Sequence, residues 1–339
     1  MSPLEETMPA PSAPPQAKTA TVSISVIIPA LNEERMIGRC LESLTKLDLA
    51  CERFEVILVD NGSRDKTLEI AESFNDRLNV RILQVRGVRI SALRNTGARA
   101  ALGDIVAFLD ADCLAPSDWL DRILALAPSD GAGVLGAHYL LPADSTWVGR
   151  TWHVYQEAPK SGEVSHIPAG DLIMRKEDFL RLGGFDETIQ TNEDYELCER
   201  ARAAGMKVRA FPEIGVVHLG TAQSLKVFFR KQAWHGMHVI KVFLRDPIRS
   251  HNRKAVFFAA YTFLCLVAVL AGAVWAAMLH GPWLFPVISA AVLYLPPTAL
   301  SLRQVFASKK WLDFFPLFVL YLTYGVARAK ALLSVKNYF

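Results

Sequence analysis

The first third of the chain alternates short apolar runs with segments of helical spacing. The apolar runs predict buried strands over residues 22–28, 54–59, 80–85 and 104–109. Helices are predicted between them, over residues 33–47, 65–74 and 90–101. The first helix carries apolar residues at one-face spacing, namely Met36, Ile37, Cys40, Leu41 and Leu44. We expect Pro29 to end the first strand, because proline lacks the N–H that a strand ladder uses.

This alternation predicts an α/β fold, Rossmann-like, with a mostly parallel sheet covered by helices on both faces. Ligands of such sheets bind beyond the carboxyl ends of the strands. After residue 130 the pattern weakens, and we predict strands over 165–175, 207–211 and 215–218 and a helix over 193–204. The chain shows no internal repeat.

Residues 224–244 mix aromatic and aliphatic side chains with Lys226, Arg230, Lys231 and Lys241. This pattern is typical of an amphipathic helix that lies in a bilayer interface. A helix packed on the soluble domain is the alternative. We assign residues 223–254 to this interfacial helix and a basic linker.

Residues 255–302 contain no Asp, Glu, Lys or Arg. The segment 255–279 is long enough to cross a bilayer. His280-Gly281-Pro282 predicts a tight turn, and a second apolar segment, interrupted by Pro296-Pro297, follows over 283–302. We therefore predict a membrane hairpin, with a buried helix pair in a soluble protein as the alternative.

Basic residues flank the hairpin on both sides and are missing from its turn. They are Arg245, Arg249, Arg253 and Lys254 before it, and Arg303, Lys309 and Lys310 after it. The positive-inside rule then predicts a multi-pass protein of the cytoplasmic (inner) membrane, with the catalytic domain facing the cytoplasm. A third span over 311–333 within the membrane region 255–339 is left open, because it would put Lys336 outside, against the charge rule.

Composition supports this picture. Apolar residues make up 51% and charged residues 21% of 339 residues, and the net charge of +3 does not favour a nucleic-acid partner. The five cysteines are odd in number and widely spaced, which indicates neither a disulfide framework nor a zinc site. Residues 1–20 are rich in Pro, Ala and Ser, lack a signal-peptide pattern, and predict a disordered tail.

Three acidic positions carry candidate chemistry. Asp60 follows the second strand, where it can accept a base N–H or a ribose hydroxyl, although Asp60-Asn61-Gly62 is also a common turn. Asp110 and Asp112 follow the fourth strand, where paired carboxylates can hold Mg²⁺ or Mn²⁺. Asp194 enters a helix, where it is either a general base or a residue that compensates the helix dipole.

Four motifs in order resemble glycosyltransferase family 2, whose members have the GT-A fold. They are residues 27–34 (IIPALNEE), 59–65 (VDNGSRD), 94–112 (from RNTGAR to FLDAD) and 183–197 (from GGFDE to EDYEL). The resemblance implies a GT-A catalytic domain over residues 21–222. It also implies a nucleotide-sugar donor, a divalent metal (Mg²⁺ or Mn²⁺) and a single inverting displacement.

The resemblance also implies roles for individual residues. Pro29, Asn32 and Glu33 would line the nucleotide pocket, Asp60 would contact the base, Asp110 would reach the ribose or the metal, Asp112 would ligate the metal, and Asp194 would be the catalytic base. Arg94 would approach the diphosphate, with a surface role as the alternative. His218 would contact metal or phosphate, with a structural role as the alternative.

Processive synthases of this family carry a Gln-x-x-Arg-Trp signature, and residues 230–234 (RKQAW) do not match it. We therefore expect transfer of a single sugar, from a UDP-sugar by frequency in the family, to a lipid-linked or glycan acceptor, with membrane lipid as a further partner. The alternatives are a processive polysaccharide synthase and a catalytically inactive membrane scaffold.

Overall fold

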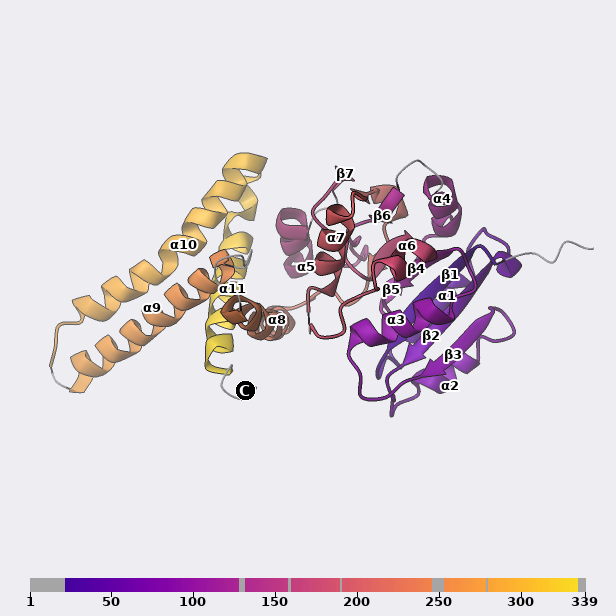
Figure 1. The fold of residues 1–339 in the computed structure, drawn as a ribbon. Helices are drawn as coiled ribbons and strands as arrows, with labels where there is room; N and C mark the ends of the chain where they lie inside the picture. The colour runs from indigo at the N-terminus through magenta and orange to yellow at the C-terminus, as the bar shows by residue number, and fades with distance from the viewer. Residues whose placement is uncertain are drawn as a thin grey trace, which may run out of the picture.

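The computed structural model describes residues 22–127, 132–157, 160–189, 191–245, 253–278 and 280–334. An α/β domain lies on one side of the molecule and a group of long helices on the other (Figure 1). The tail predicted over residues 1–20 lies outside the described part of the chain.

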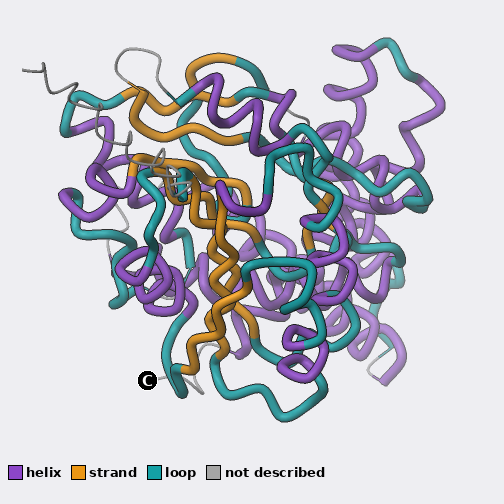
Figure 2. Tube along the Cα trace, turned by 90° about the vertical axis from the view of Figure 1, so that its right-hand side faces the viewer, coloured by secondary structure: helices purple, strands orange, loops and turns teal. Residues whose placement is uncertain are grey.

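The domain is built on an eight-stranded sheet with the order β3-β2-β1-β4-β8-β6-β9-β7. The strands gather at the centre of the domain, with helices around them (Figure 2). Their bounds are β1 Ile24–Ala30, β2 Phe54–Asp60, β3 Val80–Gln84, β4 Ile105–Leu109, β6 Ala132–Gly136, β7 Gly162–Glu163, β8 Asp171–Arg175 and β9 Lys207–Ala210.

The sheet is parallel only in part. Strands β3, β2, β1 and β4 are mutually parallel, as their sequence predicts. Strand β8 then runs antiparallel to both β4 and β6, and β7 runs antiparallel to β9, so the sheet is mixed. Antiparallel pairing needs no crossover helix, which is why the helix–strand alternation does not reveal this half of the sheet.

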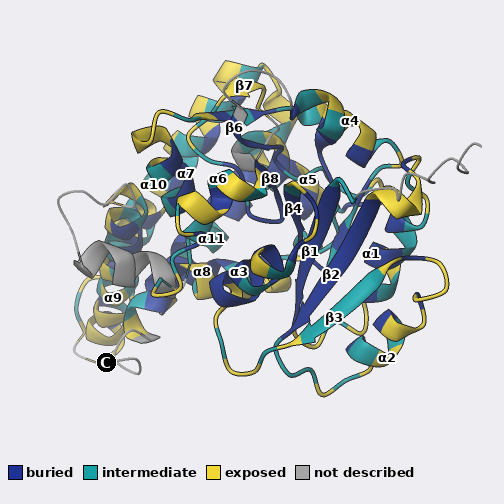
Figure 3. Cartoon of the chain, turned by 45° about the vertical axis from the view of Figure 1, so that its right-hand side comes forward, coloured by how far each residue is buried: buried dark blue, intermediate teal, exposed yellow. Residues whose placement is uncertain are grey.

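Helices cover both faces, as predicted. Helices α1 (Ile37–Leu44), α2 (Thr67–Glu72) and α4 (Trp119–Leu126) pack on the face that includes Val26 and Ile28. Helices α3 (Ile90–Ala100), α6 (Lys176–Arg181) and α7 (Glu193–Ala203) pack on the opposite face, which includes Ile27. Successive residues of a strand point to opposite faces, so a strand buried on both sides must be apolar throughout. The central strands are accordingly buried (Figure 3).

The expectation that Pro29 ends the first strand was wrong. Strand β1 continues through Pro29 to Ala30, paired with β2 up to Ala30 opposite Asp60. On its other side, the pairing with β4 ends at Ile27 opposite Phe108. At Pro29 the strand therefore makes no backbone hydrogen bond to β4 that would need an N–H donor, so proline is tolerated there.

Four helices follow the domain: α8 Leu225–Arg245, α9 Arg253–Met278, α10 Leu284–Ser308 and α11 Phe314–Ser334. Three segments, 253–278, 284–308 and 311–333, are long and apolar enough to cross a membrane. Pro296 and Pro297 lie inside α10 without ending it. Pro296 frees the carbonyl of Val292, and the hydroxyl of Tyr261 on α9 donates to that carbonyl at 2.6 Å.

Helix α11 lies beside α8 and the domain-facing helix α5 (Trp147–Trp152) rather than beside α9 and α10 alone (Figure 1). Near its start, the Tyr155 hydroxyl donates to Asp313 Oδ2 at 2.6 Å. In its middle, Tyr324 stacks on Trp152. Near its end, Gly236 of α8 lies so close to Ala331 that a Cβ on the glycine would overlap it. Along its whole length, α11 thus contacts either α8 or residues 152–155, which precede the membrane region.

Candidate active site

The carboxyl end of β2 forms a tight turn around Asp60. This fully buried carboxylate accepts the backbone N–H groups of Gly62 at 2.8 Å and of Ser63 at 3.0 Å, and the Ser63 hydroxyl donates to it as well. These are the turn bonds that Asp-Asn-Gly-Ser predicts. Contact of Asp60 with a nucleotide base remains a prediction.

The loop after β1 is tied to this turn. Asn32 has a positive φ of 56°, its N–H donates to the Ser63 hydroxyl at 2.9 Å, and its Oδ1 accepts the Arg64 N–H at 2.9 Å. Glu33 is held next to it, because its N–H donates to Thr67 Oγ1 at 2.7 Å. Asn32 and Glu33 are therefore brought to the edge of the sheet near Asp60, whereas Pro29 is buried inside β1.

Arg94 of α3 is only 2% exposed, which excludes the surface role considered for it. Its guanidinium donates to Asp110 Oδ1 at 2.6 Å and to Glu193 Oε1 at 2.8 Å. Burial by itself would lower the pKa of Arg94, because it disfavours the charged form. The charges of Asp110 and Glu193 outweigh this and raise the pKa of Arg94 above its ordinary value. Arg94 therefore joins the end of β4 to the start of α7, and the described bonds of its guanidinium go to protein carboxylates.

The other oxygen of Asp110 is also occupied. The Tyr139 hydroxyl donates to Asp110 Oδ2 at 2.9 Å and accepts the Gly170 N–H at 3.2 Å. A side chain on Gly170 would overlap Asp110 Oδ2 and the Tyr139 hydroxyl, so only glycine fits against this pair. Asp110 is thus oriented by Arg94 on one side and Tyr139 on the other.

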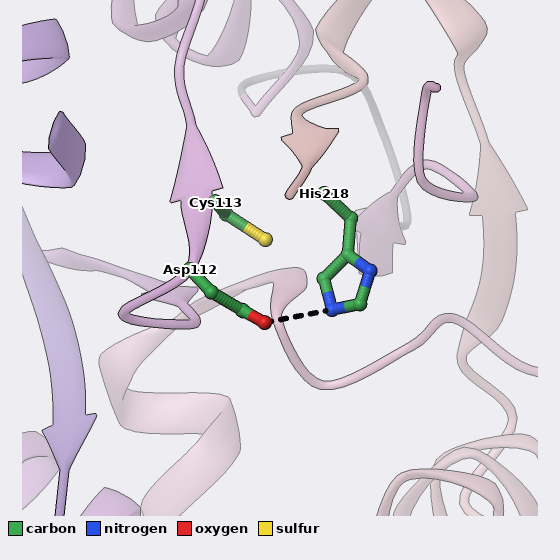
Figure 4. A group of neighbouring side chains, drawn as sticks. All are labelled: Asp112, Cys113 and His218. Carbon is green, nitrogen blue, oxygen red and sulfur yellow. Dashed lines mark ion pairs between the residues drawn. The ribbon is translucent and has the colours of Figure 1, made fainter. Parts of the chain in front are cut away.

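Asp112 and His218 are brought together by a separate two-stranded ribbon. Strands β5 (Cys113–Leu114) and β10 (Val217–His218) pair antiparallel, with His218 opposite Cys113. His218 Nε2 lies 3.3 Å from Asp112 Oδ2 (Figure 4). The His218 ring also stacks on Tyr139, with 4.6 Å between centroids. The ribbon thus places an imidazole beside a carboxylate about a hundred residues away in sequence.

The ligating atoms of Asp112, Cys113 and His218 lie within 4.8 Å of one another (Figure 4). Burial raises the pKa of the Cys113 thiol well above its ordinary range, and a protonated thiol is a poor ligand. Asp112 and His218 remain as a carboxylate–imidazole pair, and both groups can ligate a divalent cation. Asp110 does not belong to this cluster, so its predicted role as a metal ligand stays a prediction.

The local electrostatics fit a cation. Burial and the charges of Asp112, Asp110 and Asp65 raise the pKa of Glu33 to about 7. Burial also opposes the charge of Asp112, but its hydrogen bond to His218 and the charge of Lys231 lower the pKa of Asp112. Several carboxylates therefore repel one another at this edge of the sheet, and a bound divalent ion would relieve that repulsion.

Asp194 lies in the first turn of α7, after Asn192 in the left-handed conformation with a φ of 65°. Asp194 Oδ1 accepts the Tyr195 N–H at 2.7 Å, and Oδ2 accepts the Ala169 N–H at 3.2 Å. Burial raises the pKa of Asp194. This carboxylate is held rigidly and takes up a proton more readily than an exposed aspartate, as a general base should.

A cavity of about 470 Å³ opens beside the metal-side residues, and Asp194 is not among the residues that line it. Asp110, Tyr139 and His218 form one end of its wall. The rest is formed by the linker and helices that precede the membrane region, namely Val148, Gly149, Trp152, Thr221, Ala222, Phe228, Lys231, Gln232, Trp234 and His235. The cavity therefore joins the sheet edge to helix α8.

Several residues here carried no recognisable signal in the sequence. Tyr139, Cys113 and Lys231 stand outside the family motifs, and their roles follow from long-range pairing. Glu193 was visible only as the residue before Asp194, and its partner Arg94 lies 99 residues away.

Comparisons with known proteins agree with this geometry. Residues 25–182 match the family model of glycosyl transferase family 2. Glycosyltransferase AglE of Haloferax volcanii is 29% identical over 232 residues, covering 66% of this chain and 75% of that protein. Validoxylamine A glucosyltransferase of Streptomyces hygroscopicus subsp. limoneus is 30% identical over 228 residues, covering 57% of this chain and 50% of that protein. The chain thus spans half the length of the second relative.

The solved structure of mannosyltransferase PcManGT from Pyrobaculum calidifontis, in complex with GDP-Man and Mn²⁺, has a similar fold. Its TM-score is 0.62 at 19% identity, and the match covers 94% of this chain and 90% of that one. At this identity the likeness shows the fold alone. Residues 25–182 are therefore similar to a glycosyltransferase family 2 domain, and the chain that carries them has the GT-A fold.

Proposed function

We propose that this protein transfers a single sugar, with inversion, from a nucleotide-sugar to a lipid-linked acceptor, in a reaction that depends on a divalent metal. One observation carries the proposal: the Asp112–His218 pair lies beside a cavity that runs from His218 to the apolar side chains of α5 and α8. The site for the metal and the donor diphosphate would then lie next to an apolar path by which the acceptor can enter. PcManGT, bound to GDP-Man and Mn²⁺, supports the choice of metal and donor class.

In this proposal Asp194 accepts the proton of the acceptor hydroxyl. The hydroxyl oxygen forms a bond to the anomeric carbon as the bond from that carbon to the diphosphate oxygen breaks, and the nucleoside diphosphate leaves. When bound by Asp112 and His218, the metal would neutralise the charge on the leaving diphosphate. Arg94 acts as a positioning residue, because it holds Asp110 and Glu193 in fixed places.

Donor binding by the purified protein in detergent tests the proposal. We expect one member of a panel of UDP-, GDP- and dTDP-sugars to bind, and to be hydrolysed slowly, only when Mn²⁺ or Mg²⁺ is present. Binding is read by calorimetry and hydrolysis by release of the nucleotide. A protein that binds no donor with either metal would be the inactive scaffold considered above, and a long polymeric product would indicate a processive synthase.

We also propose that α9 and α10 cross the membrane and that α11 does not. From Asp313 to Ala331 the helix rises by about 27 Å, close to the thickness of the hydrocarbon core. A crossing helix would put these two residues on opposite sides. Yet Asp313 contacts Tyr155, which precedes the membrane region. At the other end, Ala331 packs on Gly236 of α8. The basic residues of α8 keep that helix out of the hydrocarbon core. Both ends of α11 then lie on the side of the catalytic domain.

Cysteine labelling of intact cells tests this topology. In a Cys51→Ser background, we expect His280→Cys, in the turn between α9 and α10, to react with a membrane-impermeant maleimide from outside. Ser334→Cys, at the end of α11, should react only after the cells are permeabilised. The matched control is the chain with native Cys51, which is exposed on the catalytic domain and should behave as Ser334→Cys does. Labelling of Ser334→Cys from outside would establish three spans instead.

A further inference from the structure

The loop that leads from β10 to α8 is closed around Asp112. The Leu219 N–H donates to the Asp112 carbonyl at 2.8 Å. The Thr221 hydroxyl donates to the His218 carbonyl at 3.0 Å. Between them, Gly220 lies so close that a Cβ there would overlap Asp112 Oδ2 and crowd the His218 ring. The chain therefore passes directly against the carboxylate–imidazole pair at Gly220.

Lys231 of α8 reaches the same point. Its ammonium donates to the Gly220 carbonyl, so it is held against the residue that covers Asp112. Burial by itself would raise the pKa of Asp112, but His218 and the charge of Lys231 outweigh it and lower that pKa. Lys231 and His218 also line the same cavity. A hydrogen bond, a charge and a shared cavity thus place the ammonium beside the Asp112–His218 pair.

The charge of Lys231 remains available for a ligand. An ammonium has three N–H donors, and the described bond takes one of them to a neutral carbonyl. Within the described part of the chain, Lys231 forms no ion pair with a carboxylate, whereas Arg94 is bonded to Asp110 and Glu193. Lys231 is also the single lysine or arginine among the described residues that line the cavity. An anion that enters the cavity would therefore meet this cation.

The order of the elements indicates which part of the donor Lys231 meets. Asp60 ends β2, Asp112 follows β4 beyond β1 in the sheet, and Lys231 comes from α8 on the far side of Asp112. In the proposed function the base lies near Asp60 and the diphosphate near Asp112. The phosphate that bears the sugar, which is the one farther from the base, would then face Lys231 and the cavity.

We propose that Lys231 binds the sugar-bearing phosphate of the donor and stabilises it as the sugar leaves. When the bond from the anomeric carbon to the phosphate oxygen breaks, its electron pair stays on that oxygen and the diphosphate gains one negative charge. Lys231 offsets this charge by donating hydrogen bonds and keeps its protons. The inference rests on the proposed function for the donor and the reaction. It adds that α8, outside the residues 25–182 that match the family model, completes the donor site.

Binding of UDP, UMP, GDP and GMP to the full-length protein, measured by calorimetry in neutral detergent with Mn²⁺, tests the proposal. We expect the native protein to bind one of the two diphosphates more tightly than the corresponding monophosphate. Lys231→Met should weaken binding of that diphosphate by about 10- to 100-fold, the range that follows from losing a charge-assisted hydrogen bond. The monophosphate lacks the outer phosphate, so its affinity should change by less than about threefold.

Two further variants separate recognition from folding. Lys226→Met makes the same substitution at an exposed position of α8 that does not line the cavity, and it should keep the native affinities. Lys231→Arg keeps the charge and should bind the diphosphate more tightly than Lys231→Met does. The Mn²⁺ affinity of the nucleotide-free protein, measured by electron paramagnetic resonance, should not fall in Lys231→Met, because a cation next to Asp112 is removed.

Three outcomes would overturn the assignment. A diphosphate affinity in Lys231→Met equal to that of the native protein would exclude the contact. Equal weakening of diphosphate and monophosphate would show that Lys231 does not recognise the outer phosphate. A lower Mn²⁺ affinity of Lys231→Met without nucleotide would reduce Lys231 to a support for Asp112 and His218.

The proposed function fails in a different way. A native protein that binds a nucleoside diphosphate with Mn²⁺, but neither hydrolyses nor transfers the sugar of any donor, would refute the transfer. Selective loss of diphosphate binding in Lys231→Met would still establish the phosphate contact. Sugar transfer by the native protein, together with an unchanged diphosphate affinity in Lys231→Met, would do the reverse. A native protein that binds no diphosphate would refute both.

Discussion

Replacing Asp112 by asparagine is expected to lower sugar transfer by about a thousandfold, as follows from losing several kcal/mol of charge stabilisation by the metal. Asp112 Oδ2 lies 3.3 Å from His218 Nε2, and a side chain on Gly220 would overlap the same oxygen, so the carboxylate is closely confined. Asparagine fills that space but offers one neutral oxygen. The turnover should be measured against Mn²⁺ concentration, and the ion concentration for half-maximal rate should rise.

Asp121→Asn is the matched control for this variant. Asp121 is exposed on α4, away from the ribbon that carries Asp112, so its replacement should leave the Mn²⁺ dependence unchanged. A native-like Mn²⁺ titration for Asp112→Asn would show that the metal is held elsewhere, and Asp110 would then be the next residue to replace.

Replacing Asp194 by asparagine is expected to lower kcat by about 10²- to 10⁴-fold, the usual contribution of a positioned base. The amide oxygen of asparagine can still accept a backbone N–H from Tyr195 or Ala169, so the start of α7 should stay in place. The amide cannot take up the acceptor proton. The donor Kd should therefore change by less than about twofold, because the base acts on the acceptor side.

The pH profile gives an independent reading of Asp194. Only the deprotonated carboxylate can act as a base, so kcat should fall as the pH drops through the pKa of Asp194. Burial raises that pKa, which moves this limb to higher pH than an ordinary aspartate would give. The limb should be lost in Asp194→Asn and kept in Glu196→Gln, a control on the same helix whose carboxylate pairs with Arg200. Near-normal kcat in Asp194→Asn would reduce Asp194 to a residue that supports the helix start.

Much of the first half of the domain is determined locally. The periodicity of apolar residues predicts β1, β2, β3 and β4 and the helices between them to within a few residues, because a buried strand or an amphipathic helix is encoded by neighbours in sequence. The order of the family motifs likewise predicts the GT-A fold, since they follow strand ends that the sheet brings to one edge.

The short elements between residues 113 and 182 were harder to predict. Strand β5 has two residues and α6 has six, too few for a hydrophobic period to be recognised. The reversal of direction at β8 is equally invisible, because a strand's pattern records which faces are buried and not which way its neighbour runs. At Pro29 the local rule gave the wrong end of a strand, since only the pairing with β4 decides whether the missing N–H matters.

By itself, the sequence determined the resemblance to glycosyltransferase family 2, the parallel half of the sheet, the acidic residues at strand ends and the uncharged segments, because all of these are properties of residue order. Only the tertiary structure decided that Arg94 is buried between Asp110 and Glu193, that His218 meets Asp112 through the β5–β10 ribbon, and that α11 runs along α8. These are contacts between residues far apart in the chain. Which residues pair depends on what the fold buries together and on their charges, and this cannot be read from neighbouring residues in the sequence.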